Sequence, residues 1–185
     1  MPDLPPAVAF APPLAIIVMG VSGCGKTTLA TLLAEALACP FLEGDHFHSP
    51  EAVAKMRSGQ PLDDGDRWPW LERLAAAAAE SIAEQGVAVL ACSALRRCYR
   101  DRLRARIGHR TRFILLENSR AQLLARLSDR GGHFMPASLL DSQLATLEPP
   151  LAEADAITLP NQYPAEQLRD LALDCLHHSL SAQTC

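Results

Sequence analysis

The chain has 185 residues, 49% of them hydrophobic and 21% charged, and a formal net charge of −4. These values describe one ordinary globular domain and exclude an intrinsically disordered chain. The acidic balance gives no global reason to bind nucleic acid or a membrane surface, and no apolar run approaches the roughly 18 residues of a membrane span.

Short apolar runs alternate with helical stretches along the chain. Residues 1–13 carry five prolines without helical or strand periodicity, which predicts a flexible tail. Short runs rich in aliphatic residues predict strands over 14–19, 41–43, 87–91, 112–116 and 156–159. Helices are predicted up to about residue 38 and over 50–58, 70–85, 96–107, 119–130, 136–147 and 164–180. Pro69 is assigned to the first turn of the helix over 70–85.

Strands that alternate with helices in this way form parallel sheets through right-handed crossovers. We therefore predict one three-layer α/β domain over residues 14–185, with a five-stranded parallel sheet covered by helices on both faces. The six cysteines form no CxxC pair, which favours reduced thiols and a cytoplasmic protein.

A phosphate-binding pattern follows the first predicted strand. Gly20, Gly25, Lys26 and Thr27 complete the P-loop GxxxxGKT between a strand and a helix. Glycines let successive N–H groups point at phosphate oxygens, Lys26 can reach the β- and γ-phosphates, and the Thr27 hydroxyl is a hard oxygen ligand for Mg²⁺. Lys26 is one of only two lysines in the chain, so a chance match is improbable. The predicted ATP-binding residues here are Gly20, Val21, Ser22, Gly23, Cys24, Gly25, Lys26, Thr27 and Thr28.

Two classes of P-loop protein, GTPases and motors, are excluded by the sequence. The other lysine, Lys55, lies in AKMR, so the guanine-reading Asn-Lys-x-Asp motif of GTPases is absent, and the chain is too short for a P-loop motor. Kinases of small molecules or nucleoside monophosphates remain. A hydroxyl acceptor needs a neighbouring carboxylate, and Asp45 stands just past the second strand. An aspartate that only completes a turn after Gly44 is the alternative.

Seven blocks in order carry a family resemblance. They are FLEGDHFHSP (41–50), KMRSGQPL (55–62), DGDRWPWL (64–71), CSAL (92–95), YRDRLR (99–104), RGGHFM (130–135) and LDSQLATLE (140–148). From about residue 15 to 160 the sequence resembles the gluconokinase family, small P-loop kinases related to shikimate kinase. It departs from the family pattern at Gly65, where an acid is usual, and at Cys24, where Ser or Gly is common.

The resemblance implies a P-loop kinase fold with strand order 2-3-1-4-5, a helical lid at about 126–140 and a homodimer. It also implies transfer of the γ-phosphoryl group of ATP to the 6-hydroxyl of D-gluconate. Lys26 would stabilise phosphate charge and Asp45 would orient or deprotonate the hydroxyl. Kinases of shikimate or another sugar acid are the nearest alternatives. A non-catalytic nucleotide-dependent module that holds RNA or protein is an alternative of another class.

Arginines and histidines are the candidates for binding the acidic acceptor. Arg67 suits a carboxylate because its fork can bind both oxygens, although a surface ion pair with Asp64 or Asp66 is the alternative. His48 either donates to a sugar hydroxyl or is packed. The basic segment after the third strand lies where α/β sheets place ligands. From it we expect substrate contacts from Arg96 or Arg97, and from Arg100, rather than nucleic-acid binding.

The remaining candidates lie in the expected lid. Arg126 and Arg130 precede Gly131-Gly132-His133, the pattern of a glycine hinge that closes over ATP, excludes water and brings cations to the phosphates. Arg130 is the expected catalytic cation, His133 an acceptor contact, and a lid arginine is expected to stack on adenine near residues 160–162. Two arginines that cap a helix are the alternative. Cys24, at a helix N-terminus beside Lys26, is expected to be a reactive thiol that ATP protects.

Overall fold

The computed structural model describes residues 13–129 and 137–181. The predicted catalytic Arg130, the predicted acceptor contact His133, and the proline-rich tail apart from Pro13 lie outside these ranges. Among the described helices, none is long and apolar enough to cross a membrane.

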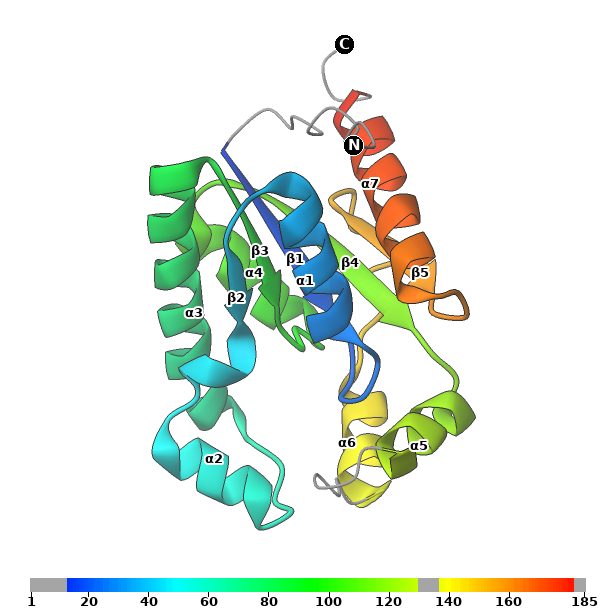
Figure 1. Ribbon diagram of the computed structural model, residues 1–185. Helices are drawn as coiled ribbons and strands as arrows, with labels where there is room; N and C mark the ends of the chain where they lie inside the picture. The colour runs from blue at the N-terminus through cyan, green and yellow to red at the C-terminus, as the bar shows by residue number, and fades with distance from the viewer. Residues whose placement is uncertain (1–12, 130–136, 182–185) are drawn as a thin grey trace.

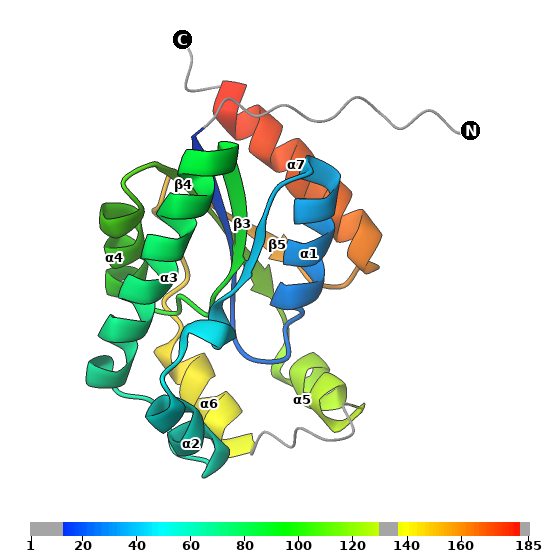
Figure 2. The ribbon, with the colours of Figure 1, turned by 60° about the vertical axis from the view of Figure 1, so that its left-hand side comes forward.

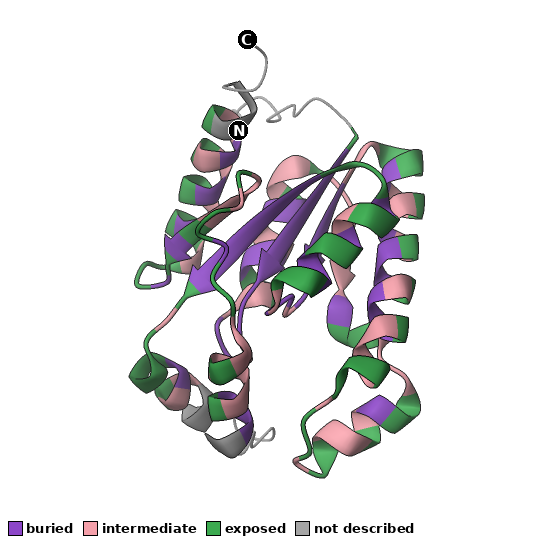
Figure 3. Ribbon diagram, turned by 180° about the vertical axis from the view of Figure 1, so that it is seen from behind, coloured by how far each residue is buried: buried purple, intermediate pink, exposed green. Residues whose placement is uncertain are grey.

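A five-stranded parallel sheet forms the middle of the molecule (Figure 1). The strands are β1 (Leu14–Met19), β2 (Phe41–Glu43), β3 (Val87–Ala91), β4 (Arg110–Glu117) and β5 (Ala156–Pro160). Their order is β2-β3-β1-β4-β5, which confirms the predicted order. β1 lies between β3 and β4, and each of its six residues is buried, as expected for a continuous aliphatic strand covered on both faces (Figure 3).

Two helical layers cover the sheet. On one face α1 (Lys26–Leu37) packs over β1 and β3, and α7 (Ala165–Ser181) packs beside α1 and over β5, through Leu33 and Ala172 among others. On the other face α3 (Asp64–Gln85) and α4 (Arg97–Ile107) pack through Leu74 and Leu103. Alternate residues of β1 point into the two cores, Ile16 into the first and Ile17 into the second. The predicted three-layer arrangement is therefore confirmed.

Three more helices lie beyond the carboxyl edge of the sheet, at the bottom of Figures 1 and 2. They are α2 (Pro50–Arg57), α5 (Arg120–Asp129) and α6 (Ala137–Thr146). The P-loop and a 3₁₀ turn, η1 (Gly44–Phe47), lie at the same edge because parallel strands all end there. This edge places the nucleotide-binding loop, the first residues after β2 and the start of α4 beside one another.

The beginning of α3 corrects the sequence prediction. Pro69 was assigned to the first turn, but α3 begins at Asp64 and contains Pro69 as its sixth residue. The reason is a capping box, in which the Asp63 carboxylate accepts from the N–H of Asp66 and the Asp66 carboxylate accepts from the N–H of Asp63. Lys55 donates to both carboxylates, so α2 is tied to the additional turn.

Candidate active site

The P-loop presents unpartnered backbone N–H groups at the start of α1. Gly25, the residue before the helix, has φ +92°, a left-handed conformation that glycine adopts without strain. Within the described part of the chain, no acceptor bonds to the N–H groups of Gly23, Gly25, Lys26, Thr27 and Thr28. Several free N–H groups at one helix N-terminus form an anion-binding nest. The loop therefore has the geometry that a di- or triphosphate requires.

The cation and metal candidates lie beside this nest. Lys26 Nζ donates to the Val21 carbonyl at 3.1 Å, so the ammonium is folded against the loop. Thr27 Oγ1 donates to Glu43 Oε2 at 2.7 Å. A hydroxyl and a carboxylate from the ends of neighbouring elements form a hard oxygen donor set, which fits Mg²⁺. Thr27 was predicted from the sequence but Glu43 was not, although it is an acidic residue that ends β2 two positions before Asp45.

Cys24 is not the accessible thiol that the sequence suggested. Its side chain is 0% exposed and belongs to the core against β1 and α1. A Cβ on Gly20 would lie only 2.9 Å from Cys24 Sγ, so the loop closes tightly over the sulfur. Reaction of a thiol needs access as well as charge. The expectation that Cys24 is a reactive thiol protected by ATP is therefore inconsistent with its burial.

Asp45 projects from η1 at the carboxyl edge, and 83% of its side chain is exposed. The turn is held in place at Gly44, where an added Cβ would lie 2.3 Å from the Ala91 carbonyl oxygen of β3. Trp70 Nε1 donates to the Gly44 carbonyl at 2.7 Å. A buried α3 side chain thus fixes the backbone directly before the exposed carboxylate.

His48 lies next to Asp45, but its side chain is buried, whereas that of Asp45 is exposed. Its side chain is 4% exposed and stacks on Trp70 with the ring centroids 4.3 Å apart. Burial lowers the pKa of His48 against the opposing effect of Asp45, so the imidazole is neutral at pH 7. Nε2 lies 4.0 Å from Asp45 Oδ1, and Nδ1 is buried with no hydrogen-bond partner among the described residues. The structure therefore places His48 in packing contact and also beside the carboxylate.

Arg67 belongs to a polar cluster between the starts of α3 and α4. Its NH1 donates to Tyr99 Oη at 3.0 Å, and its guanidinium lies over the Tyr99 ring at 5.3 Å. Tyr99 Oη donates in turn to Asp64 Oδ1, and Arg96 NH1 donates to the Asp64 carboxylate. Arg67 forms no ion pair with Asp64 or Asp66 within the described residues, so the surface-pair alternative is wrong. Tyr99, which the sequence analysis did not assign, holds Arg67 at its place.

The three arginines predicted from the basic segment have different surroundings. Arg96 also lies over the Tyr99 ring, at 5.5 Å, and pairs with Asp64 and Glu148. Arg97 is exposed and pairs with Asp101 on the outer surface of α4. Arg100 was expected to contact substrate, but it is 1% exposed and is bound by Glu153 and the Ala94 and Leu95 carbonyls. Since these acceptors occupy its guanidinium, Arg100 is a structural residue, and that expectation is wrong.

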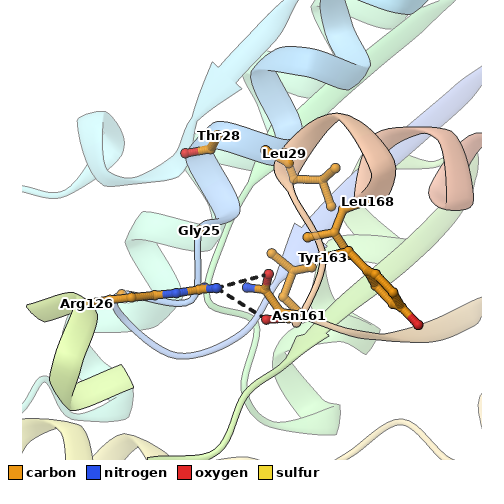
Figure 4. A pocket seen from close by; sticks show the side chains of 10 residues that line it. Gly25, Thr28, Leu29, Arg126, Asn161, Tyr163 and Leu168 are labelled. Carbon is orange, nitrogen blue, oxygen red and sulfur yellow. Dashed lines mark hydrogen bonds between the residues drawn. The ribbon is translucent and has the colours of Figure 1, made fainter. Parts of the chain in front are cut away.

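A pocket of about 300 Å³ opens on the other side of the P-loop (Figure 4). Apolar side chains from α1 and α7 line one part of it, including Leu29 and Leu168. Arg126 of α5 faces them and donates to the carbonyl and the side-chain oxygen of Asn161. Asn161 Nδ2 also donates to the Cys24 carbonyl of the P-loop. A flat cation opposite apolar side chains suits an adenine ring that continues from the phosphate nest.

α6 supplies a contact that the sequence analysis did not anticipate. The N–H of Ser22 in the P-loop donates to Gln143 Oε1 at 2.7 Å, across 121 residues of sequence. Gln143 lies in one of the resemblance blocks, but nothing in the pattern around it indicated the residue that it meets. Of the predicted site residues that the structure describes, the P-loop, Asp45, His48, Arg67, Arg96 and Arg126 gather at one edge.

A phosphate nest, a hard oxygen pair and an exposed carboxylate on this five-stranded sheet define a P-loop kinase. The family model described as "AAA domain" matches residues 16–150. A probable gluconokinase of Schizosaccharomyces pombe is 42% identical, covering 87% of this chain and 86% of that protein. A gluconokinase of Gluconobacter oxydans is 51% identical, covering 75% and 77%. The crystal structure of a gluconokinase from Sinorhizobium meliloti 1021 superposes with a TM-score of 0.80 at 42% identity, covering 94% and 98%. The chain belongs to the gluconokinase family.

Proposed function

We propose that the protein transfers the γ-phosphoryl group of ATP to the 6-hydroxyl of D-gluconate, giving 6-phospho-D-gluconate and ADP. One observation carries the proposal: the free N–H nest of the P-loop and the Asp45 carboxylate face the same edge, with Arg67 beyond Asp45. This arrangement suits an anionic acceptor that carries a hydroxyl. The names of the relatives and of the similar structure supply the identity of the sugar acid.

In the reaction, a bond forms between O6 of gluconate and the γ-phosphorus, and the bond from that phosphorus to the β,γ-bridging oxygen breaks. Asp45 orients the hydroxyl and accepts its proton as the new bond forms. Lys26 and the P-loop N–H groups hold the negative charge that shifts toward the β-phosphate of the departing ADP. A Mg²⁺ held through Thr27 and Glu43 would neutralise phosphate charge.

The residues proposed to bind gluconate and those proposed to bind adenine lie on opposite sides of the P-loop. Arg67 binds the gluconate carboxylate through its fork, with Arg96 beside it and His48 limiting the space behind Asp45. On the other side Arg126 and the apolar wall of the pocket hold the adenine. Arg130 and His133 keep their proposed roles as the lid cation and an acceptor contact. We further infer that the protein is a cytoplasmic homodimer. Light scattering coupled to gel filtration tests the oligomeric state.

The experiment is a panel of acceptors with MgATP and the purified protein, read by release of ADP. D-gluconate is expected to give the highest kcat/KM, well above shikimate and other sugar acids. Higher activity with another acid would keep the kinase and replace the substrate. Nucleotide binding without ADP release for any acceptor would instead favour a non-catalytic nucleotide-dependent module.

A further inference from the structure

We infer that Gln143 is a catalytic residue, which donates a hydrogen bond from its side-chain amide to the γ-phosphoryl group. The inference deepens the proposed function and rests on it for the identity of the acceptor alone. It begins with the contact between Gln143 Oε1 and the N–H of Ser22. Because only the oxygen of an amide accepts from an N–H, this contact fixes which end of the side chain meets the P-loop.

The remaining donors of Gln143 are free. In the described part of the chain no group accepts a hydrogen bond from its Nε2. The NH₂ group is attached to the same carbon as the oxygen that Ser22 holds, so it lies at the mouth of the P-loop. Ser22 directly precedes the N–H nest that starts at Gly23, and the nest itself remains open. Gln143 therefore borders the phosphate site without blocking it.

Three contacts hold α6 in place. Leu140 is 0% exposed and belongs to the core cluster to which α1 and α7 also contribute. Asp141 forms a two-bond ion pair with Arg120 of α5. Glu148, just after α6, accepts from the N–H of Arg97 at 2.6 Å, and its own N–H donates to the Leu95 carbonyl. A donor whose support is fixed in this way needs little reorganisation during the reaction.

The position of α6 agrees with contact to the transferred group. Figures 1 and 2 show α6 between α2 and α5 at the carboxyl edge of the sheet. The adenine pocket lies on the α5 side, lined by Arg126, while the acceptor residues Asp45 and Arg67 lie toward α2 and α3. The γ-phosphoryl group must move between these two sides. Gln143, which reaches the P-loop from α6, therefore lies where it can contact the γ-phosphoryl group during transfer.

The test uses Gln143→Glu, which keeps the oxygen that Ser22 needs and removes both donors. Binding of MgADP and of the Mg complex of AMPPNP, the β,γ-imido analogue of ATP, is measured by calorimetry without an acceptor. We expect affinity for AMPPNP to fall about tenfold and that for ADP, which has no γ-phosphoryl group, to change less than about twofold. In the full reaction kcat is expected to fall about 100-fold.

The two nucleotides separate the inference from simpler effects. An equal loss of affinity for ADP and AMPPNP would overturn the inference, because ADP lacks the γ-phosphoryl group. The new carboxylate would itself repel the γ-phosphoryl group, so the uncharged variant Gln143→Met must show the same selective loss, and wild-type affinity for AMPPNP in that variant would also overturn the inference. A purely structural role would leave the glutamate variant unchanged for both ligands, which would overturn it too. Gln143→Met also loses the oxygen that Ser22 binds, so a purely structural role would weaken both nucleotides equally in this variant, and that result would overturn the inference.

Gln122→Glu is the matched control. Gln122 Oε1 also accepts from a backbone N–H, that of Ser119 at 2.8 Å, but it is exposed near the start of α5. This variant should bind both nucleotides as the wild type does. Because the binding measurements need no acceptor, they remain valid if gluconate is not the substrate, and the acceptor panel alone decides that question.

Discussion

The Asp45 side chain is exposed, as a carboxylate that contacts substrate must be. The backbone before it is fixed by the close approach of Gly44 to β3 and by the hydrogen bond from Trp70 to the Gly44 carbonyl. Asp45→Asn keeps the size of the side chain but removes its ability to accept a proton. We expect kcat to fall at least about 100-fold while KM for ATP stays within about threefold. Steady-state kinetics with both substrates varied measures the two parameters.

Asp170→Asn is the control for this change, because Asp170 is a carboxylate on α7 that pairs only with its neighbour Arg169 among the described contacts. It should leave kcat unchanged. If Asp45→Asn retained a third or more of the wild-type kcat, Asp45 would be a turn residue, as the alternative reading of the sequence held.

Arg67 provides the second prediction at this scale. Lys in its place keeps the charge but loses the planar fork and the bond to Tyr99 Oη. KM for gluconate is expected to rise roughly tenfold or more, with KM for ATP unchanged, because only the acceptor carboxylate is affected. An equal rise in both KM values would show that Arg67 supports the fold of the site and does not bind the acid.

Elements differ in how far the sequence determines them. β1, β2 and β3 agree with the predicted bounds because each is a short aliphatic run between clear turn signals. The start of α3 was misplaced because proline is commonest in a first turn, while the signal that controls this start is the pairing of Asp63 with Asp66. Which of these two signals sets the start of α3 depends on contacts that only the folded chain makes. One such contact is the hydrogen bond from Lys55 to Asp63.

The contact between α3 and η1 gives a prediction for these elements. Trp70→Phe keeps an aromatic ring against His48 but leaves the Gly44 carbonyl without its buried donor. The free energy of unfolding is expected to fall by about 1–3 kcal/mol. The kcat should also fall, because Gly44 fixes the backbone before Asp45. Chemical denaturation and kinetics on the same preparation measure both effects.

Trp68→Phe is the comparison, since Trp68 is partly buried against the Tyr99 ring and its indole N–H makes no hydrogen bond within the described residues. It should lose less stability than the Trp70 variant. Equal losses would mean that ring packing, and not the hydrogen bond to Gly44, stabilises this corner.

On the scale of the whole molecule, the sequence located the site better than the role of each residue in it. The P-loop is a local pattern, so it could be found from spacing alone. Arg100 could not be placed, because its burial depends on Glu153, which lies 53 residues later. Gln143 and Ser22 are 121 residues apart, so only the folded chain brings them together. Long-range contacts of this kind have no signature in a single sequence.

Glu153, which accepts hydrogen bonds from Arg100 and Arg104 of α4, makes the free energy of unfolding depend on pH in the acid range. Burial would raise its pKa, but hydrogen bonds from Arg100 and Arg104 outweigh burial and hold it at about 2, below its ordinary 4.5. A folded-state pKa below the unfolded one stabilises the protein above pH 4.5, and this contribution is lost as the pH falls toward 2. Glu153→Gln should therefore lower the free energy of unfolding at pH 7 by about 3 kcal/mol.

Denaturant unfolding of both proteins across this pH range checks the sign. The difference between wild type and Glu153→Gln should shrink as the pH falls from 4.5 toward 2, while kcat at pH 7 stays the same. A difference that does not depend on pH would contradict the assigned ionisation of Glu153.

The central claim is that the P-loop and Asp45 together direct phosphate to the primary hydroxyl of gluconate. Proton-coupled ³¹P NMR of a reaction with MgATP and D-gluconate tests it most directly. Phosphate on C6 couples to the two protons of that carbon, so we expect a new phosphomonoester triplet that grows as the γ-phosphate signal declines. A doublet from a secondary alcohol, a singlet from the carboxylate, or inorganic phosphate alone would contradict the account.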